Sequence, residues 1–172
     1  MRDRLHLQLL RLYQQLPTWL RRRIVRTVSP SYTVGAMCFI ERDDGAVLLV
    51  RQAYRKRWGV PGGLLKRGED ATDGARREVF EEVGIAVELV GEPRVVVDAE
   101  PQRVDVVYRA RVADGIDPGL AEPRSPEILE TRWFPREALP ELQHETVTAL
   151  LALARPGPSV SAPALGVDAP GR

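Results

Sequence analysis

Residues 63–85 read GLLKRGEDATDGARREVFEEVGI, and three of their carboxylates share one side of a predicted helix. Glu78, Glu81 and Glu82 stand at positions i, i+3 and i+4, which lie on one helical face. Like charges at this spacing repel by about 0.2–0.5 kcal/mol per pair, and the helix dipole further disfavours anions in the last turn. A hard divalent cation would remove both penalties, and Mg²⁺ takes such oxygen ligands beside phosphates. From spacing alone, the alternative is a solvated acidic face that pairs with neighbouring arginines.

The sequence also marks both ends of this helix. Asp70 is a suitable N-cap residue, and Asp73, three positions later, makes an acidic variant of the capping box. Gly84 stands where a residue in the left-handed conformation would end the helix. A glycine-rich loop at residues 61–63 comes shortly before the helix. Next to the carboxylates lies an apolar face that can pack on a sheet, formed by Ala75, Val79 and Val83.

The whole stretch resembles the signature of the Nudix hydrolases, the Nudix box. That signature is a glycine, five residues, a glutamate, seven residues, Arg-Glu, an apolar residue, any residue, Glu-Glu, any residue, a glycine and an apolar residue. The fixed positions are filled here by Gly63, Glu69, Arg77, Glu78, Val79, Glu81, Glu82, Gly84 and Ile85. The lead-in at residues 58–63 is also similar to the family's approach to the box. So many constrained positions are far more specific than an isolated glycine motif.

The resemblance implies a metal site on the predicted helix. Glu78, Glu81 and Glu82 would ligate one or more Mg²⁺ ions, for which Mn²⁺ could substitute. A backbone carbonyl of Gly62 or Gly63 would be a further ligand. Glycines suit this loop because they let the backbone approach a metal or a phosphate closely.

The same resemblance gives roles to residues around the metal ligands. Glu69 would pair with Arg77 and hold the loop against the helix, which keeps the ligands oriented. Arg51, after the second predicted strand, would clamp a phosphate. The alternative for Arg51 is a solvated arginine at a strand end. We expect Trp58 to pack rather than to stack on a base.

A general base is expected outside the box, because carboxylates committed to a metal are poor proton acceptors. Related enzymes often draw this acid from a loop beyond the box. Glu127, at the entry to a predicted strand over residues 128–134, is our first choice. Glu130, inside that strand, is the second, since it could instead pair with an arginine on its own face. The expected catalytic set is Glu81, Glu82 and Glu127, and a box glutamate acting as the base is the remaining alternative.

The implied reaction is hydrolysis of a diphosphate linkage in a nucleoside diphosphate derivative. A nucleotide sugar, ADP-ribose, a nucleoside triphosphate and a dinucleoside polyphosphate are all open, because the substrate loops carry no pattern that we can decode. Nucleophile systems fit poorly, since Cys38 lacks a partner and the only histidines are His6 and His144. Two alternatives share the fold: a non-catalytic nucleotide-binding or regulatory module and an isomerase. Such modules usually lose box glutamates, which this chain retains.

Composition limits the partners and the compartment. The net charge is +1 over 172 residues, which argues for no particular partner. The resemblance implies a small-molecule nucleotide substrate, and we expect no stable nucleic-acid binding. A single cysteine excludes an internal disulfide and favours a reducing compartment. No apolar run approaches the roughly 20 residues that span a bilayer. We therefore expect a cytoplasmic protein.

Three regions follow one another along the chain. Residues 1–30 form a basic amphipathic helical extension, which we expect to pack on its own domain or on a partner in a homodimer. Peripheral contact with an anionic membrane, or with nucleic acid, is the alternative for this segment. Residues 31–155 would form the Nudix hydrolase domain. Residues 156–172 are rich in Pro, Ala and Gly, and we expect them to be disordered.

The central region alternates predicted strands and helices. Strands at 32–40 and 46–50 flank a hairpin turn at 43–45. Beyond the box come predicted strands at 86–90, 94–97, 103–112 and 128–134, and a closing helix at 146–153. Periodicity alone indicates α/β or α+β. The Nudix resemblance narrows this to α/β, an α/β/α sandwich with a mixed sheet, plus the N-terminal helical extension.

Overall fold

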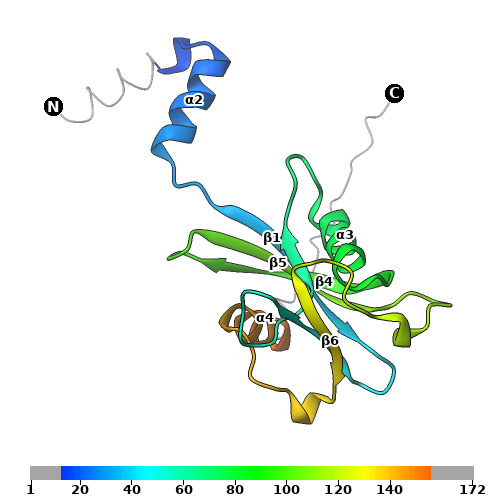
Figure 1. Ribbon diagram of the computed structural model, residues 1–172. Helices are drawn as coiled ribbons and strands as arrows, with labels where there is room; N and C mark the ends of the chain where they lie inside the picture. Colours follow the sequence, from blue (N-terminus) through cyan, green and yellow to red (C-terminus); the bar gives the residue numbers. More distant parts are fainter. Residues whose placement is uncertain (1–12, 156–172) are drawn as a thin grey trace, which may run out of the picture.

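The computed structural model describes residues 13–155, in which a mixed β-sheet lies between two helices (Figure 1). The strand order is β4-β5-β1-β2-β6, and β3 pairs with β1 outside this path. The strands are β1 (Thr33–Glu41), β2 (Val47–Gln52), β3 (Gly62–Leu64), β4 (Val87–Asp98), β5 (Arg103–Val112) and β6 (Ile128–Phe134). The helices are α2 (Thr18–Val28), α3 (Ala71–Val83) and α4 (His144–Ala154), with short 3-10 turns η1 (Pro118–Leu120) and η2 (Arg136–Ala138). The predicted α/β/α sandwich with a mixed sheet is confirmed.

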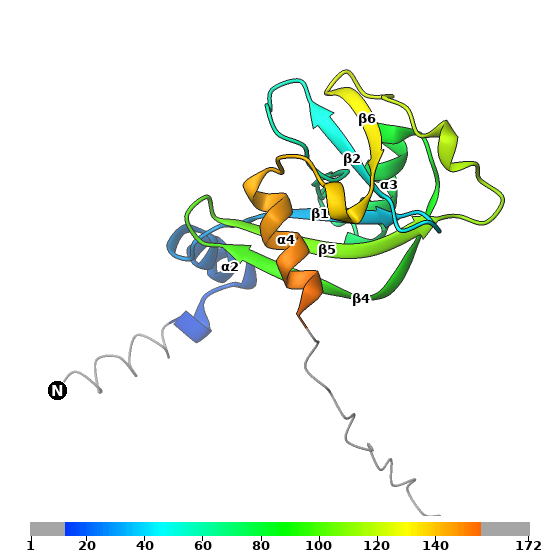
Figure 2. The same ribbon diagram turned by 90° about the horizontal axis from the view of Figure 1, so that it is seen from below.

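β1 is the central strand, and its apolar run is buried on both faces. It pairs in parallel with β5 along its whole length. Because successive side chains point to opposite faces, Cys38 belongs to the core under α3 and Phe39 to the core under α4. The two helices therefore cover opposite faces of the sheet (Figure 2). Burial raises the pKa of the Cys38 thiol to about 12, in agreement with an inert core cysteine.

The box loop is fixed to the middle of the sheet by β3. Gly62–Leu64 pairs antiparallel with residues 35–37 of β1. The N–H of Cys38 donates to the carbonyl of Pro61 at 3.0 Å, which extends the same ladder. The sequence did not predict β3, because three residues with two glycines carry no strand periodicity. Its pairing brings the glycine loop alongside α3.

β4 differs from the prediction of two separate strands. It runs without a break along β5, and the register shifts between Val90 and Arg94. Gly91 lies in this stretch with φ 68°, the kind of backbone that a bulge uses. The irregularity interrupts the alternating pattern in the sequence without ending the strand.

The N-terminal extension is helical at α2, as predicted, and stands away from the sheet (Figure 1). None of the α2 residues is buried, and Trp19 is 66% exposed. The expectation that this arm packs on its own domain is therefore not met over α2. Its first residues, 1–12, and the predicted tail, 156–172, lie outside the described part of the chain. None of the helices within residues 13–155 has the length and apolar character needed to cross a membrane.

Candidate active site

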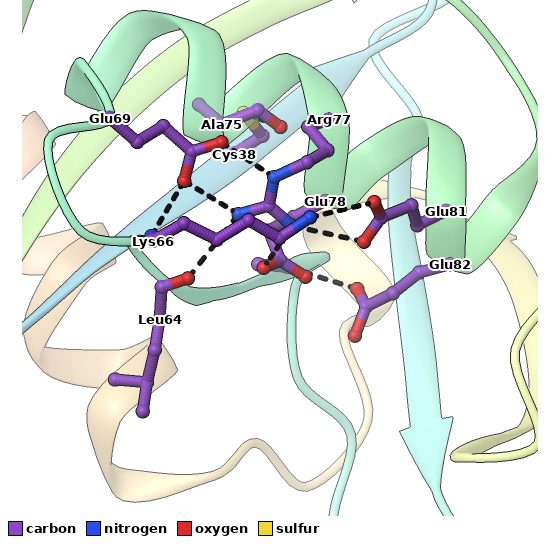
Figure 3. Close-up of polar contacts among 10 residues, drawn as sticks. Cys38, Leu64, Lys66, Glu69, Ala75, Arg77, Glu78, Glu81 and Glu82 are labelled. Carbon is purple, nitrogen blue, oxygen red and sulfur yellow. Dashed lines mark hydrogen bonds and ion pairs between the residues drawn. The ribbon is translucent and has the colours of Figure 1, made fainter.

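α3 begins and ends where the sequence predicted. Asp70 accepts a hydrogen bond from the N–H of Thr72 at 2.8 Å, and Gly84 ends the helix with φ 76°. The buried apolar face, Ala75, Val79 and Val83, fixes the rotation of the helix about its axis. Packing of this face on the sheet turns the acidic side toward the β3 loop, as Figure 3 shows.

Arg77 joins three carboxylates of the box (Figure 3). Its guanidinium holds Glu69 through two hydrogen bonds, from Nε at 2.6 Å and from Nη2 at 2.8 Å. Nη1 donates to Glu78 at 2.7 Å and to Glu81 at 2.9 Å. Glu69 also accepts the N–H of Lys66 at 2.8 Å within the loop, so the Glu69–Arg77 pair ties this loop to the helix. The structure thus brings Glu69 and Arg77 together in the predicted pair.

These contacts shift the ionisation of the paired groups. Hydrogen bonds from Arg77 lower the pKa of Glu69 to about 2. The same pairing raises the pKa of Arg77, so its charge is permanent. Slight desolvation opposes the shift at Glu81, but hydrogen bonds from Arg77 and Lys66 lower its pKa. All three groups are therefore ionised at neutral pH.

Glu82 lies in a different environment. Its side chain is buried, and one carboxylate oxygen accepts the N–H of Gly62 at 2.9 Å. Burial raises the pKa of Glu82 to about 8, and the negative charges of Glu78, Glu127 and Glu81 add to this shift. A buried carboxylate with like charges around it lacks a counter-charge. A divalent cation beside the loop would supply one.

The glycine loop leaves room for this arrangement. A Cβ on Gly63 would lie 2.6 Å from the carboxyl carbon of Glu78, so only glycine lets that carboxylate lie against the loop. Glu78, Glu82 and the backbone carbonyls of Gly62 and Gly63 form an oxygen-rich donor set, which fits Mg²⁺. The donor types therefore match the predicted metal.

The three box glutamates are not yet gathered around one point. No group of three or more acidic, histidine or cysteine side chains in residues 13–155 is arranged to hold a metal. Nη1 of Arg77 instead donates to both Glu78 and Glu81. Half of the Glu81 side chain is exposed, and it also reaches Lys66 at 3.4 Å. Glu81 would have to leave both cations before it could join a metal site with Glu82.

A cleft opens beside the box. A cavity of about 430 Å³ is bordered by the box loop, Glu78 and Glu82, together with Tyr54, Arg55, Arg103 and Glu127. A larger cavity of about 860 Å³ shares several of the same lining residues, namely Met37, Arg55, Arg103, Gln143 and Glu145. The two cavities therefore adjoin, and the box stands at one end of a longer groove.

The other predicted residues separate into two groups. Glu127 lines the cavity that Glu82 also lines. Glu130 instead pairs with Arg51 at 2.9 Å and with Arg132 at 3.0 Å. Arg51 thus forms an ion pair with a residue of β6. It is not one of the described residues that line the box cavity. Its phosphate-binding role stays a prediction that this ion pair does not favour.

Tyr54 and Arg103 line the cleft and were not among the site residues predicted from the sequence. Tyr54 is 64% exposed and lines the box cavity, whereas Trp58 packs edge-to-face on Phe134 with ring centroids 4.9 Å apart. Arg103 begins β5 and lines both cavities. Nothing local marks Arg103, because its place depends on the pairing of β5 with β1. An aromatic residue shortly after the second predicted strand was the available sequence signal for Tyr54.

Comparison with known proteins agrees with this geometry. The family model described as NUDIX domain matches residues 31–152. A MutT-like protein of Streptomyces ambofaciens is 31% identical over 136 residues, which cover 78% of this chain and 85% of that protein. The human 8-oxo-dGDP phosphatase NUDT18 is 34% identical over 115 residues, 63% of this chain but only 33% of that protein. The crystal structure of a MutT NUDIX hydrolase from Burkholderia pseudomallei is 30% identical with a TM-score of 0.60, covering 72% of this chain and 99% of that one.

Fold and site thus define a hydrolase domain of the α/β/α sandwich class, with a carboxylate-lined cleft at the box. The chain belongs to the Nudix hydrolase family. The predictions of that family and of an enzyme of the pyrophosphohydrolase type are confirmed.

Proposed function

We propose that this Nudix hydrolase cleaves a diphosphate linkage in a nucleoside diphosphate derivative, with Mg²⁺ bound between α3 and the glycine loop. The observation that carries the proposal is Glu82, a buried carboxylate beside Glu78 at the end of a groove. A substrate phosphate and a divalent cation would together compensate its charge. Mn²⁺ is expected to substitute for Mg²⁺, since it accepts the same oxygen ligands.

Each residue of the box has a distinct role in this proposal. When bound, the divalent cation neutralises phosphate oxygens and lowers the pKa of a coordinated water. Glu78, Glu82 and the carbonyl of Gly62 would hold it, and Glu81 would be a further ligand once released from Arg77 and Lys66. Glu69 keeps Arg77 aligned, and through it the orientation of Glu78.

Glu127 is proposed as the general base that takes a proton from the attacking water. It lines the same cavity as Glu82, and its negative charge contributes to the raised pKa of Glu82. The carbonyl of Glu127 accepts the N–H of Ala53 at 2.8 Å, which holds this loop against the end of β2. A loop residue fixed in this way meets the geometric requirement for a base better than Glu130, which is paired with arginines.

The substrate is proposed to be a free nucleotide rather than a nucleic acid, in agreement with the net charge of +1. One relative is named as an 8-oxo-dGDP phosphatase, so oxidised nucleoside diphosphates belong in the test panel. ADP-ribose, nucleotide sugars and nucleoside triphosphates complete it. We propose a cytoplasmic location, and the exposed apolar side chains of α2 are available for a second copy of the chain or a membrane surface.

The test is a hydrolysis assay on that panel with Mg²⁺, with Mn²⁺ and with EDTA, followed by chromatography of the products. We expect one class of diphosphate to be cleaved at its anhydride only in the presence of metal. Full turnover in excess EDTA would contradict the metal role. Tight nucleotide binding with no cleavage of any compound would instead identify a binding module.

A further inference from the structure

Two carboxylates are buried among the described residues, Glu82 and Asp105, and both border the groove. The proposed metal site accounts for Glu82. Asp105, on β5, pairs instead with Arg103, two residues earlier on the same strand. The Asp105 side chain is 8% exposed and that of Arg103 is 30% exposed, so the carboxylate is buried and the guanidinium partly buried. Removing a carboxylate from water in this way costs free energy that a single ion pair seldom recovers. The pair therefore calls for a functional explanation.

Asp105 holds only one part of the Arg103 side chain. Its two oxygens accept hydrogen bonds from Nε of Arg103 at 2.9 and 2.8 Å. The terminal groups Nη1 and Nη2 donate to no residue within the described range. The hydrogen bonds to Asp105 raise the pKa of Arg103, so the guanidinium stays charged. Its two terminal groups are free to bind an anion.

Gly35, on β1, shows how near this guanidinium lies to the box. A Cβ on Gly35 would lie 2.6 Å from Oδ1 of Asp105, 3.0 Å from Nη2 of Arg103 and 3.0 Å from the carbonyl oxygen of Gly63. The absence of a side chain at Gly35 thus lets the guanidinium and the box loop approach each other. An anion could then contact the loop and Arg103 together.

We propose that Arg103 binds the phosphoryl group adjacent to the one held at the box metal, and that Asp105 is its positioning residue. The ligand class is an organic diphosphate whose attached group extends into the larger cavity of about 860 Å³. A guanidinium fixed at Nε presents its two terminal groups as a planar fork, which matches the geometry of phosphate oxygens. This inference rests on the proposed function and deepens it, because it makes two adjacent phosphoryl groups the recognised element.

Arg51 provides an internal comparison. It too is a strand arginine on a carboxylate, but its Nε and Nη2 both donate to Glu130, at 3.1 and 2.9 Å. Arg51 stands opposite Glu130 in the pairing of β2 with β6, and β6 and β4 are at opposite ends of the strand order. Arg103, in contrast, lines both cavities of the groove. Only the second arginine has both free donors and access to the box cavity.

The experiment measures the affinity of α,β-methylene-ADP and of AMP, each with Mg²⁺, by titration calorimetry. We expect the wild-type protein to prefer the diphosphate analogue. Arg103→Gln should weaken analogue binding about 10- to 100-fold and remove the preference over AMP, since charge-assisted hydrogen bonds are lost. Arg103→Lys should keep part of the preference for the diphosphate analogue over AMP. Arg111→Gln is the matched control, an exposed arginine at the other end of β5 that pairs with Glu88 and Asp114, and it should bind within twofold of wild type.

Asp105→Asn tests the positioning role. It should weaken analogue binding about 3- to 10-fold, and the double variant with Arg103→Gln should bind no more weakly than Arg103→Gln alone. Additive losses would show that Asp105 does not act through Arg103. If Asp105→Asn lowers the melting temperature too far to be assayed, Asp105→Glu takes its place, and its loss of affinity should likewise not add to that of Arg103→Gln.

Two results separate this inference from the proposed function. If Arg103→Gln keeps the diphosphate preference and an unchanged KM, the proposed phosphoryl-binding role of Arg103 is overturned, even if the wild type hydrolyses nucleotides. If the wild type binds the analogue through Arg103 but cleaves no compound, the hydrolase proposal is overturned and the phosphoryl-binding role of Arg103 stands. A third result, a wild type without any preference for the diphosphate, overturns the role of Arg103 directly.

Discussion

The two walls of the groove are assembled differently. The box wall, Gly62, Gly63, Glu78 and Glu82, comes from one short stretch of chain that forms a strand, a loop and a helix. The composite wall, Tyr54, Arg55, Arg103 and Glu127, takes its residues from three distant segments. Helical spacing and the short pairing of β3 with β1 order the first wall, whereas contacts between segments far apart in the chain order the second. A local motif can therefore identify the chemistry of a site without identifying what the site recognises.

The walls also differ in how their charges are balanced. In the box wall, Glu82 is buried, no arginine or lysine among the described residues pairs with it, and burial raises its pKa. In the composite wall, Arg103 is held by Asp105 and Arg55 pairs with Glu145 at 3.1 Å. The first wall thus holds a carboxylate that no described side-chain cation balances, whereas the second has its cations already positioned. This is the arrangement expected where a metal and a diphosphate meet.

The largest expected effect tests the box wall. Glu82→Gln should lower kcat by about 10³-fold, because loss of a ligand leaves metal and phosphate charge uncompensated. Its melting temperature should equal or exceed that of wild type, since a buried charge is removed. Steady-state kinetics and thermal melts check both parts. Glu92→Gln, on the exposed bulge of β4, is the control, and near-normal turnover of Glu82→Gln would remove Glu82 from the catalytic set.

The next effect tests whether the composite wall takes part in the chemistry. Glu127→Gln should lower kcat by about 10²-fold and erase the acidic limb of the pH–rate profile, because a positioned base is lost. The measurement is kcat as a function of pH at saturating Mg²⁺. Glu130→Gln, next in the same segment, should have a smaller effect and keep the acidic limb. If the acidic limb survives in Glu127→Gln, Glu127 is not the general base, and a glutamate of the box wall takes the proton instead.

A smaller effect concerns alignment within the box. Arg77→Lys keeps the charge but loses the two-point contact with Glu69, so it should weaken Mg²⁺ activation about 10-fold. Titration of activity with Mg²⁺ measures this change. Arg76→Lys, on the exposed side of the same turn, is the matched control. Equal Mg²⁺ dependence of the two variants would show that the Arg77 fork is dispensable.

The smallest effect is on stability and follows from the raised pKa of Glu82, about 8 against an ordinary 4.5. Below pH 4.5 the carboxyl is protonated in both the folded and the unfolded state. Between pH 4.5 and 8 the unfolded chain releases the proton first, so the free energy of unfolding falls as pH rises. In EDTA, the melting temperature of wild type should drop between pH 5 and 8 by about 5 °C more than that of Glu82→Gln. Parallel pH curves for the two proteins would argue against a buried ionisable Glu82.

The sequence by itself determined the acidic face of α3, both ends of that helix and the family. The carboxylate spacing, the cap at Asp70, the stop at Gly84 and the pair of Glu69 with Arg77 all follow from contacts within one segment of chain. Short-range geometry is the same in almost any fold, so residue order is enough to predict it. The apolar runs likewise predicted most strands, because a buried central strand has to be apolar on both faces.

Only the tertiary structure decided the rest. β3 exists because β1 offers it a partner, and β4 continues past Gly91 because β5 stays beside it. Arg51 and Arg103 look alike in the sequence, but the pairing of β2 with β6 gives Arg51 a carboxylate outside the groove. The parallel pairing of β5 with β1 brings Arg103 beside the box loop. Such contacts join residues far apart in the chain, and no local pattern encodes which strand will lie next to which.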